Sequence, residues 1–325
     1  MALVSHEAIT EPNTTVTWYI PEDQAIPAWV HPTSIEITQE VVRRLRGLSQ
    51  SVLQNYGQAD FMVRDTEEDR LYRGHRAVAE HGSVFVLREV TPSRPTLDHE
   101  ALRYPAMIRK ALLSDELLRG GLFLIVGTTG DGKSTTAAAT VISRLHRFGG
   151  VAVTVEDPPE FILSGAYSDG FCLQMPVNSA NGGFAAGIKS ALRCYPSGLR
   201  STQLFIGEIR DSLSATETLR ACLNGHLVIA TLHALDIPSA IKRMISLAGS
   251  SMNRNSDEAA EILGEGFRGC IHQRLTRNGP EMTMLVANQN NTSVMSHIRN
   301  GDVHLLRSDI QRQEGLMKVG RLPWE

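Results

Sequence analysis

The segment "LFLIVGTTGDGKSTTAAAT", residues 122–140, constrains the fold of this chain most strongly. An apolar run is followed by three closely spaced glycines, a lysine and a row of small residues, which predicts a strand, a tight loop and a helix. Gly127 to Ser134 fits the pattern G-x-x-x-x-G-K-[ST] of the phosphate-binding P-loop. Side chains on the glycines would keep the backbone amides from wrapping round a polyphosphate. The segment therefore predicts a loop that holds a nucleoside triphosphate.

Each position of this loop has an expected part in binding. Lys133 should reach the β- and γ-phosphates, and the Ser134 hydroxyl should coordinate Mg²⁺. The residues predicted to bind the nucleotide are Gly127, Thr128, Thr129, Gly130, Asp131, Gly132, Lys133, Ser134 and Thr135. Kinases, GTPases and motor ATPases share such a loop, but no N-K-x-D guanine signature follows it, which argues against a GTPase. ATP with Mg²⁺ is therefore the expected ligand.

Length, charge and cysteine spacing narrow the class of protein. The chain has 325 residues, which favours two domains. A formal net charge of -3 gives no general attraction to nucleic acid, so direct nucleic-acid binding is not expected. The chain shows no signal-peptide pattern and its apolar runs are too short to span a membrane, so we expect a cytoplasmic protein. The four cysteines lack metal-ligand spacing and are expected to be buried thiols; they are Cys172, Cys194, Cys222 and Cys270.

The first part of the chain predicts a small α+β domain. Residues 1 to about 30 are expected to form an extended or irregular arm, and apolar residues at helical spacing predict a helix over 37–57. Residues 71–90 predict two strands that turn at His81 and Gly82. "TPSRPTL", with two prolines, predicts a linker. The expected domains are residues 1–92, a linker at 93–98 and a larger domain at 99–325.

The larger domain alternates predicted strands and helices. After a helix at 99–113, strands are expected at 122–126, 151–156, 203–207 and 227–233, and helices at 133–148, 184–195 and 214–225. The strands lack polar alternation, as in parallel strands that are covered on both faces. Beyond "DIPSAIKRMISLAG" the sequence is expected to be mainly helical. The predicted fold class is α/β.

Acidic and imidazole side chains stand at the ends of these strands. "TVEDPPEF" places Glu156 and Glu160 after a strand that we expect beside the P-loop strand. "LFIGEIRD" ends another strand with Glu208, and "GHLVIATLHA" places His226 and His233 at opposite ends of a third. Open α/β sheets bind ligands at the carboxyl ends of their strands. These residues are therefore candidates for the active site.

In this order behind a P-loop, the motifs resemble the secretion ATPase superfamily, which includes PilT-like pilus-retraction motors and DotB-like ATPases of type IVB secretion. The resemblance rests on a Walker A motif at 127–134, an Asp box at 156–160, a Walker B motif at 204–211 and a His box at 225–233. The segments "GFRGCIHQRL" and "IRNGDVHLLRSDIQRQEGLM" also look like family elements. The resemblance covers residues 100 to 317 and is faint before residue 70. It implies a RecA-like P-loop ATPase domain and a smaller, PAS-like α+β N-terminal domain.

The resemblance also implies roles for the acidic and imidazole groups. Glu208 and Glu160 are the candidates to polarise the attacking water. Many P-loop ATPases carry an aspartate for Mg²⁺ where this chain has Glu208, so the metal is expected to depend on Ser134, water and the Asp-box acids, with Glu156 as the candidate ligand. His233 is expected to sense the γ-phosphate, and His226 to support its strand.

Arginines are expected to clamp the transition state, because they are planar, permanently charged donors. By resemblance these are Arg73 and Arg88 of the N-terminal domain, with Arg193 of the ATPase domain. Lys189 stands where a second arginine is usual. The stretch between Arg193 and the Walker B motif is longer than is usual in the family and lacks its Asp-Pro-Asp, so Arg200 is an alternative to Arg193.

The resemblance implies a hexameric motor ATPase that powers a bacterial cell-envelope machine. The machine is either type IVB secretion or conjugation (DotB-like) or type IV pilus retraction (PilT-like). The expected partners are further copies of this chain and inner-membrane components, which would keep the protein cytoplasmic and peripheral at the inner membrane. The chain ends at Glu325, before the final helices of many relatives, and we expect this to alter subunit or partner contacts. The alternatives are a nucleotide-gated, non-hydrolysing docking ring and a DNA-translocating RecA-like motor, which the acidic balance disfavours.

Overall fold

The chain divides into two compact units. One contains residues 1–93 with Pro158–Ile162, and the other contains Arg94–Asp157 with Leu163–Glu325. In the ranges described below, no helix is long and apolar enough to cross a membrane. The computed structural model describes residues 16–33, 35–56, 59–80, 82–90, 94–178, 181–252, 255–287 and 292–324.

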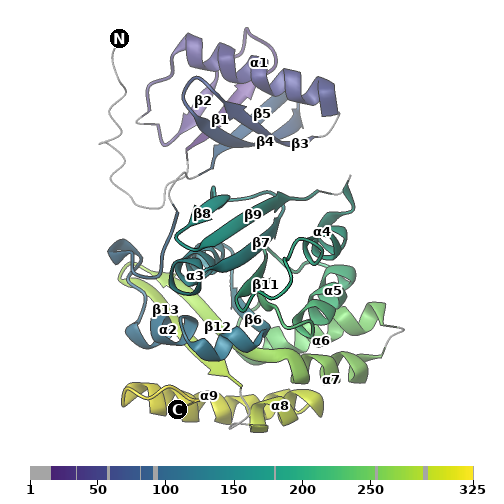
Figure 1. Ribbon diagram of the computed structural model, residues 1–325. Coiled ribbons are helices and arrows are strands. Elements are labelled where there is room, and N and C mark those ends of the chain that lie inside the picture. The colour runs from purple at the N-terminus through teal and green to yellow at the C-terminus, as the bar shows by residue number, and fades with distance from the viewer. Residues whose placement is uncertain are drawn as a thin grey trace. The chain divides into compact units, whose positions relative to one another are not determined.

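The N-terminal unit is a five-stranded antiparallel sheet with helix α1 on one face (Figure 1). The strand order is β2-β1-β5-β4-β3. Its elements are β1 Thr17–Pro21, β2 Trp29–His31, α1 Gln39–Tyr56, β3 Asp60–Asp65, β4 Arg70–Ala79 and β5 Gly82–Glu89. Leu45 of α1 shares a buried core with Ile20 and Phe85 of the sheet. The predicted helix and strand pair are confirmed, while His81 of the expected turn lies outside the described residues.

The expectation of an extended or irregular arm over residues 1 to about 30 holds for the described part only in that the chain is extended, because β1 and the start of β2 pair within the sheet there. Within β1 only Tyr19 is exposed, so the strand lacks the period-two burial that would mark it. A run this short is difficult to separate from coil by its sequence alone. Residues 1–15 of the expected arm lie outside the described residues.

Arg44 ties α1 to the turn between β3 and β4. Its guanidinium donates to Asp65 Oδ2 at 2.9 Å, to Glu67 Oε2 at 3.0 Å and to Glu68 Oε1 at 2.6 Å. The Asp65 side chain is only 1% exposed. A buried carboxylate requires a cationic partner, so Arg44 compensates a charge that the core would otherwise not tolerate.

The C-terminal unit is built on an eight-stranded sheet with the order β13-β12-β6-β11-β10-β7-β9-β8. The strands from β12 to β9 run parallel, and β13 and β8 pair antiparallel at the two edges. The strands are β6 Gly121–Gly127, β7 Gly150–Glu156, β8 Gly165–Tyr167, β9 Gly170–Pro176, β10 Thr202–Ile206, β11 Leu227–His233, β12 Phe267–Thr276 and β13 Gly279–Val286.

Helices cover both faces of this sheet (Figure 1). Alternate residues of β6 point to opposite faces. Leu122 and Leu124 enter the core beneath α4 to α7, while helix α3 packs on the other face. The helices are α2 Ala106–Leu112, α3 Lys133–Phe148, α4 Gly183–Ala191, α5 Ser212–Cys222, α6 Ile237–Ser251, α7 Ser256–Gly266, α8 Thr292–Arg299 and α9 Leu306–Lys318, with 3₁₀ turns η2 Glu100–Leu102, η3 Asp115–Arg119 and η5 Val303–Leu305.

The expectation that the chain is mainly helical after α6 is confirmed by α7, α8 and α9, but it missed the hairpin that β12 and β13 form there. The segment "GFRGCIHQRL" is mostly the strand β12, which lies inside the sheet between β13 and β6. Cys270 and Ile271 are both fully buried. A strand that is covered on both faces reads as a short apolar run, which periodicity cannot distinguish from a helix.

Two predicted helices are shorter than expected. The helix over 99–113 is broken into η2 and α2, because Pro105 supplies no backbone N–H and Arg103 takes a left-handed conformation with φ of 47°. The helix over 184–195 ends at Ala191. Cys194, expected to be buried, is exposed, whereas the other three cysteines are buried as predicted.

We expect Arg44→Met to lower the stability of the N-terminal unit by about 3 kcal/mol, because it leaves the buried Asp65 carboxylate without its cationic partner. Hydrogen exchange of the α1 and β3 amides measures this local opening free energy. The matched control is Arg43→Met on the same helix, because Arg43 is exposed and its loss should change the opening free energy by less than about 0.5 kcal/mol. Equal protection in the two variants would contradict the role of Arg44.

Candidate functional site

The sheet order brings three sequence motifs to one edge. β11 lies between β6, which leads into the P-loop, and β10, which precedes Glu208. These strands are parallel, so their carboxyl ends meet, and His233 pairs in register with Gly127. The strand that ends with Glu156 is not beside the P-loop strand as expected, because β11 and β10 separate β7 from β6. The residue between the P-loop and Glu208 is therefore His233.

A continuous row of contacts links the P-loop lysine to this glutamate. Lys133 Nζ donates to the Thr128 carbonyl at 2.6 Å and lies 3.5 Å from His233 Nδ1. His233 Nε2 lies 3.0 Å from Glu208 Oε1, and Arg210 Nε donates to Glu208 Oε2 at 2.6 Å. Glu208 is thus held from both sides, at the edge where the P-loop begins.

The surroundings of His233 determine which of its ring nitrogens carries a proton. Burial lowers the pKa of His233, and the positive charge of Lys133 lowers it further, while Glu208 raises it by a smaller amount. The ring is therefore neutral at pH 7. In the matching tautomer, Nε2–H donates to Glu208 and Nδ1 accepts from Lys133. The carbonyl of His233 also accepts from Arg243 Nη1 at 3.1 Å, which fixes the end of β11.

The three glycines of the loop are required for two different reasons. Gly130 and Gly132 have φ of 86° and 79°, a left-handed conformation that other residues rarely adopt. Gly127 instead lies against β12, since an added Cβ would come 2.4 Å from the carbonyl oxygen of Gln273. The sequence interpretation assigned all three glycines to phosphate access, so for Gly127 it missed the closeness of β12.

The loop and the start of α3 fit a polyphosphate. The hydrogen-bond ladder of α3 begins with Thr136 N–H donating to Gly132 O, which leaves the amides of residues 133–135 before the ladder. Such a helix start attracts anions. Lys133 is 7% exposed and already lies at this end of the helix. In the ranges that the structure describes, no group of three or more His, Cys, Asp or Glu is placed to hold a metal.

Glu156 lies beneath the Walker B segment. An added Cβ on Gly207 would come 3.3 Å from Cα and from Cγ of Glu156. The Glu156 side chain is buried, and its Oε1 accepts from the Thr154 hydroxyl at 2.7 Å and from the Gln174 amide at 2.8 Å. This oxygen is engaged with the protein itself.

Three of the predicted catalytic residues belong to the N-terminal unit. Glu160 lies in the Pro158–Ile162 segment, which groups with that unit. Arg73 of β4 and Arg88 of β5 are direct cross-strand partners. Their neighbour Tyr72 points into the core, so the two arginines project from the opposite face of the sheet. Their parts in catalysis stay predictions.

The remaining candidates lie away from the row of contacts. Arg193 is exposed just after α4, and Arg200 is exposed before β10. Lys189 Nζ pairs with Glu217 at 3.4 Å. His226 lies at the opposite end of β11 from His233, where its ring stacks on that of Tyr195 at 4.2 Å.

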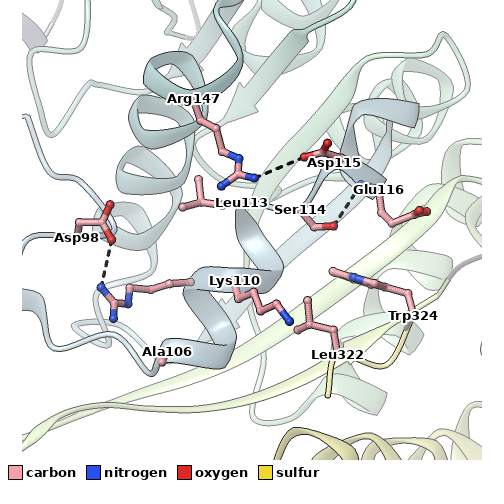
Figure 2. A pocket seen from close by; sticks show the side chains of 11 residues that line it. Asp98, Ala106, Lys110, Leu113, Ser114, Asp115, Glu116, Arg147, Leu322 and Trp324 are labelled. Carbon is pink, nitrogen blue, oxygen red and sulfur yellow. Dashed lines mark hydrogen bonds and ion pairs between the residues drawn. The ribbon is translucent and has the colours of Figure 1, made fainter. Parts of the chain in front are cut away.

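A separate pocket of about 590 Å³ contains none of the predicted site residues. Figure 2 shows two ion pairs on its wall, between Arg109 and Asp98 and between Arg147 and Asp115. The pocket is lined by Asp98, Ala106, Arg109, Lys110, Leu113, Ser114, Asp115, Glu116, Arg147, Leu322 and Trp324. Opposite charges on its wall pair with each other, so the pocket presents no single charge to a ligand.

Sequence reasoning missed three contributions to the site. It gave Arg210 no role although the residue stands two positions after Glu208, and it gave none to Arg243. It also noticed "GFRGCIHQRL" without seeing that Gln273 contacts the P-loop. The sequence gives no local signal for this contact, because Gln273 lies between His272 and Arg274 and not in an apolar run.

Comparison with known proteins agrees with this arrangement. The family model described as type II/IV secretion system protein matches residues 74–317. YggR of Escherichia coli K12, described as an uncharacterized protein, is 32% identical over 265 residues, which cover 80% of this chain and 76% of that protein. The type IV pilus ATPase PilU of Pseudomonas aeruginosa is 29% identical over 231 residues, covering 70% of this chain and 56% of PilU.

The fold is similar to that in the crystal structure of the pilus retraction motor PilT with bound ADP. The TM-score is 0.71 at 23% identity, over 92% of this chain and 86% of PilT. The predicted fold class, an α/β RecA-like ATPase domain with a smaller α+β N-terminal domain, is confirmed. By the extent of the family match and the similarity to YggR, the chain belongs to the type II/IV secretion system ATPase superfamily.

Proposed function

We propose that this protein hydrolyses ATP to drive mechanical work in a bacterial cell-envelope machine. The observation that carries the proposal is the row formed by Lys133, His233 and Glu208 at one edge of the sheet. Hydrolysis requires a cation on the phosphates and a fixed carboxylate that orients water. Lys133 is the cation and Glu208 is the carboxylate, and both side chains contact His233.

In the proposed reaction the loop amides and Lys133 bind the β- and γ-phosphates. Ser134 and Glu156 are the proposed ligands of Mg²⁺, which neutralises phosphate charge when bound. Because one Glu156 oxygen already accepts two hydrogen bonds, we assign Ser134 the larger part. Glu208 is the proposed group that orients the attacking water, and Glu160 is the alternative.

His233 is the proposed sensor of the γ-phosphate. Lys133 contacts Thr128 and His233, and it would have to exchange these contacts for phosphate oxygens. Nδ1 of the neutral ring would then no longer accept a hydrogen bond from Lys133, while Nε2–H would still donate to Glu208. The position of Glu208 would in this way depend on whether a phosphate is present.

The arginines are the proposed transition-state clamps. Arg73 and Arg88 stand directly opposite each other on β4 and β5. Their pairing places two planar, permanently charged donors side by side, which is the chemistry that stabilises charge on a transferring phosphoryl group. We propose that they act on ATP held by a neighbouring subunit, with residues 1–92 and 99–325 as the two domains and 93–98 as the linker. Arg193 stays a candidate without supporting contacts.

The proposed assembly is a homo-hexamer that acts at the cytoplasmic side of the inner membrane on components of its machine. Similarity to PilU favours a type IV pilus machine, and the motif resemblance to DotB-like ATPases keeps type IVB secretion or conjugation as the alternative. Direct binding to nucleic acid is not part of the proposal.

Phosphate release by the purified chain tests the proposed activity. Lys133→Ala should abolish turnover, because it removes the charge that faces the phosphates. Glu208→Gln and Glu160→Gln keep shape and lose charge, so the true water-orienting residue should show a loss of about 10² to 10⁴ in rate while nucleotide binding survives. Wild-type turnover in Lys133→Ala would remove the P-loop assignment. Binding without turnover in the wild type would favour the docking ring, and stimulation by DNA would favour a translocating motor.

The acid limb of the pH–rate profile tests the His233 contacts. We expect kcat/KM for ATP to fall only below the ordinary histidine pKa of 6.5, because this ratio reports the free enzyme, in which a protonated ring cannot accept from Lys133. Stability should fall in the same direction, since the unfolded chain takes up a proton near pH 6.5 that the folded ring resists. Ring titration by NMR should give a pKa that rises in Lys133→Ala and falls further in Glu208→Gln. A wild-type pKa at or above the ordinary value would contradict the tautomer.

Mixing of inactive subunits tests whether the arginines act between subunits. One chain carries Arg73→Ala with Arg88→Ala, and the other carries Lys133→Ala. Mixed rings should regain part of the activity, because one chain supplies the P-loop and the other the arginines, whose delivery in known systems is worth about 10³ or more. Native mass spectrometry should show that both chains are present. No recovery in such rings would place the arginines in the same subunit or outside catalysis.

A further inference from the structure

Strand β12 holds the P-loop through one buried side chain. Gln273 is 2% exposed. Its Nε2 donates to the backbone carbonyl of Asp131 in the loop, and its Oε1 accepts from the Thr136 hydroxyl of α3 at 2.6 Å. One amide thus connects the loop to the first turn of the helix that follows it.

The backbone of β12 makes two further contacts with the loop. The carbonyl oxygen of Gln273 fills the space where a Cβ on Gly127 would lie, at 2.4 Å. The backbone N–H of Leu275 donates to Asp131 Oδ1 at 3.2 Å. The start and the middle of the loop therefore both rest on the same strand.

Asp131 extends this support across the loop. Its Oδ2 accepts from the backbone N–H of Thr128 at 2.6 Å and from the Thr128 hydroxyl at 2.7 Å. Burial would raise the pKa of the Asp131 carboxyl, but the hydrogen bonds from Thr128 and from the Leu275 N–H outweigh it, so the pKa lies below its ordinary value. The carboxylate is therefore ionised at pH 7 and bridges Thr128 to β12.

The loop needs such support because of its own composition. Gly130 and Gly132 can adopt many conformations, so fixing them in one costs conformational entropy. A binding loop that is already ordered avoids that cost when the ligand arrives. Removal of the Gln273 amide would leave the Asp131 carbonyl without this buried donor and would release the loop from α3.

We propose that Gln273 is a positioning residue that fixes the P-loop in its phosphate-binding conformation before the nucleotide binds. It touches neither the proposed nucleotide nor the attacking water, and it acts through Asp131 and Thr136. The inference rests on the proposed ATPase function for its effect on affinity, whereas the order of the loop is measurable without any nucleotide.

The matched pair Gln273→Met and Gln203→Met tests this proposal. Methionine keeps the length of the side chain and removes its hydrogen bonds. Gln203 of β10 is 1% exposed, and within the described part of the chain its side-chain amide has no hydrogen-bond partner, so the same change there removes none. The readouts are hydrogen exchange of residues 127–135 without nucleotide, binding of a fluorescent ADP analogue, and KM and kcat for ATP.

We expect Gln273→Met to increase the rate of hydrogen exchange of residues 127–135 about tenfold and to raise the KM for ATP about tenfold, because two buried hydrogen bonds are lost. The kcat should change by less than about threefold, since Lys133, His233 and Glu208 are untouched. Gln203→Met should leave all readouts near the wild-type values. Identical loop exchange and KM in the two variants would overturn the proposal.

Faster hydrogen exchange of the β10 and β11 amides would show that Gln273→Met disturbs the fold. A second variant keeps the proposal testable in that case. Thr136→Val is nearly isosteric and removes the hydroxyl that donates to Gln273 and that also lies 3.1 Å from the Tyr104 hydroxyl. Faster loop exchange in Thr136→Val with β10 and β11 unchanged would support the proposal, and unchanged loop exchange would overturn it. If the wild type binds no nucleotide while Gln273→Met still loosens the loop, the ATPase proposal fails and the positioning role stands.

Discussion

The parallel pairing of β11 with both β6 and β10 is the constraint on which the candidate site depends. It places the P-loop on one side of β11 and Glu208 of the Walker B motif on the other. The last residue of β11, His233, contacts both Lys133 and Glu208. A neutral imidazole suits this position because it accepts on one side and donates on the other. The contact of His233 with both Lys133 and Glu208 therefore follows from strand order.

The P-loop is supported from two directions that have different chemistry. On the side of α3, the helix N-terminus and Lys133 present positive potential to a ligand. On the side of β12, the support is a set of hydrogen bonds through Gln273 and Asp131. A loop rich in glycine binds well only when something else orders it, so the second set complements the first.

The N-terminal unit carries two different arrangements of arginine. Arg44 neutralises the buried Asp65 and stabilises the unit. Arg73 and Arg88 are direct cross-strand partners on the face away from α1. The first arrangement belongs to the core of the unit, and the second places two arginines side by side on one face of the sheet.

The sequence by itself determined the P-loop with its strand and helix, the four central parallel strands and the motif residues at their ends, because glycine spacing and short apolar runs are local signals. It missed the β12–β13 hairpin and set β7 beside β6. Only the tertiary structure decided that β11 stands between β6 and β10, and that Gln273 reaches Asp131 across 142 positions of the chain. Strand order and such contacts arise from the packing of distant segments, and no local spacing encodes that packing.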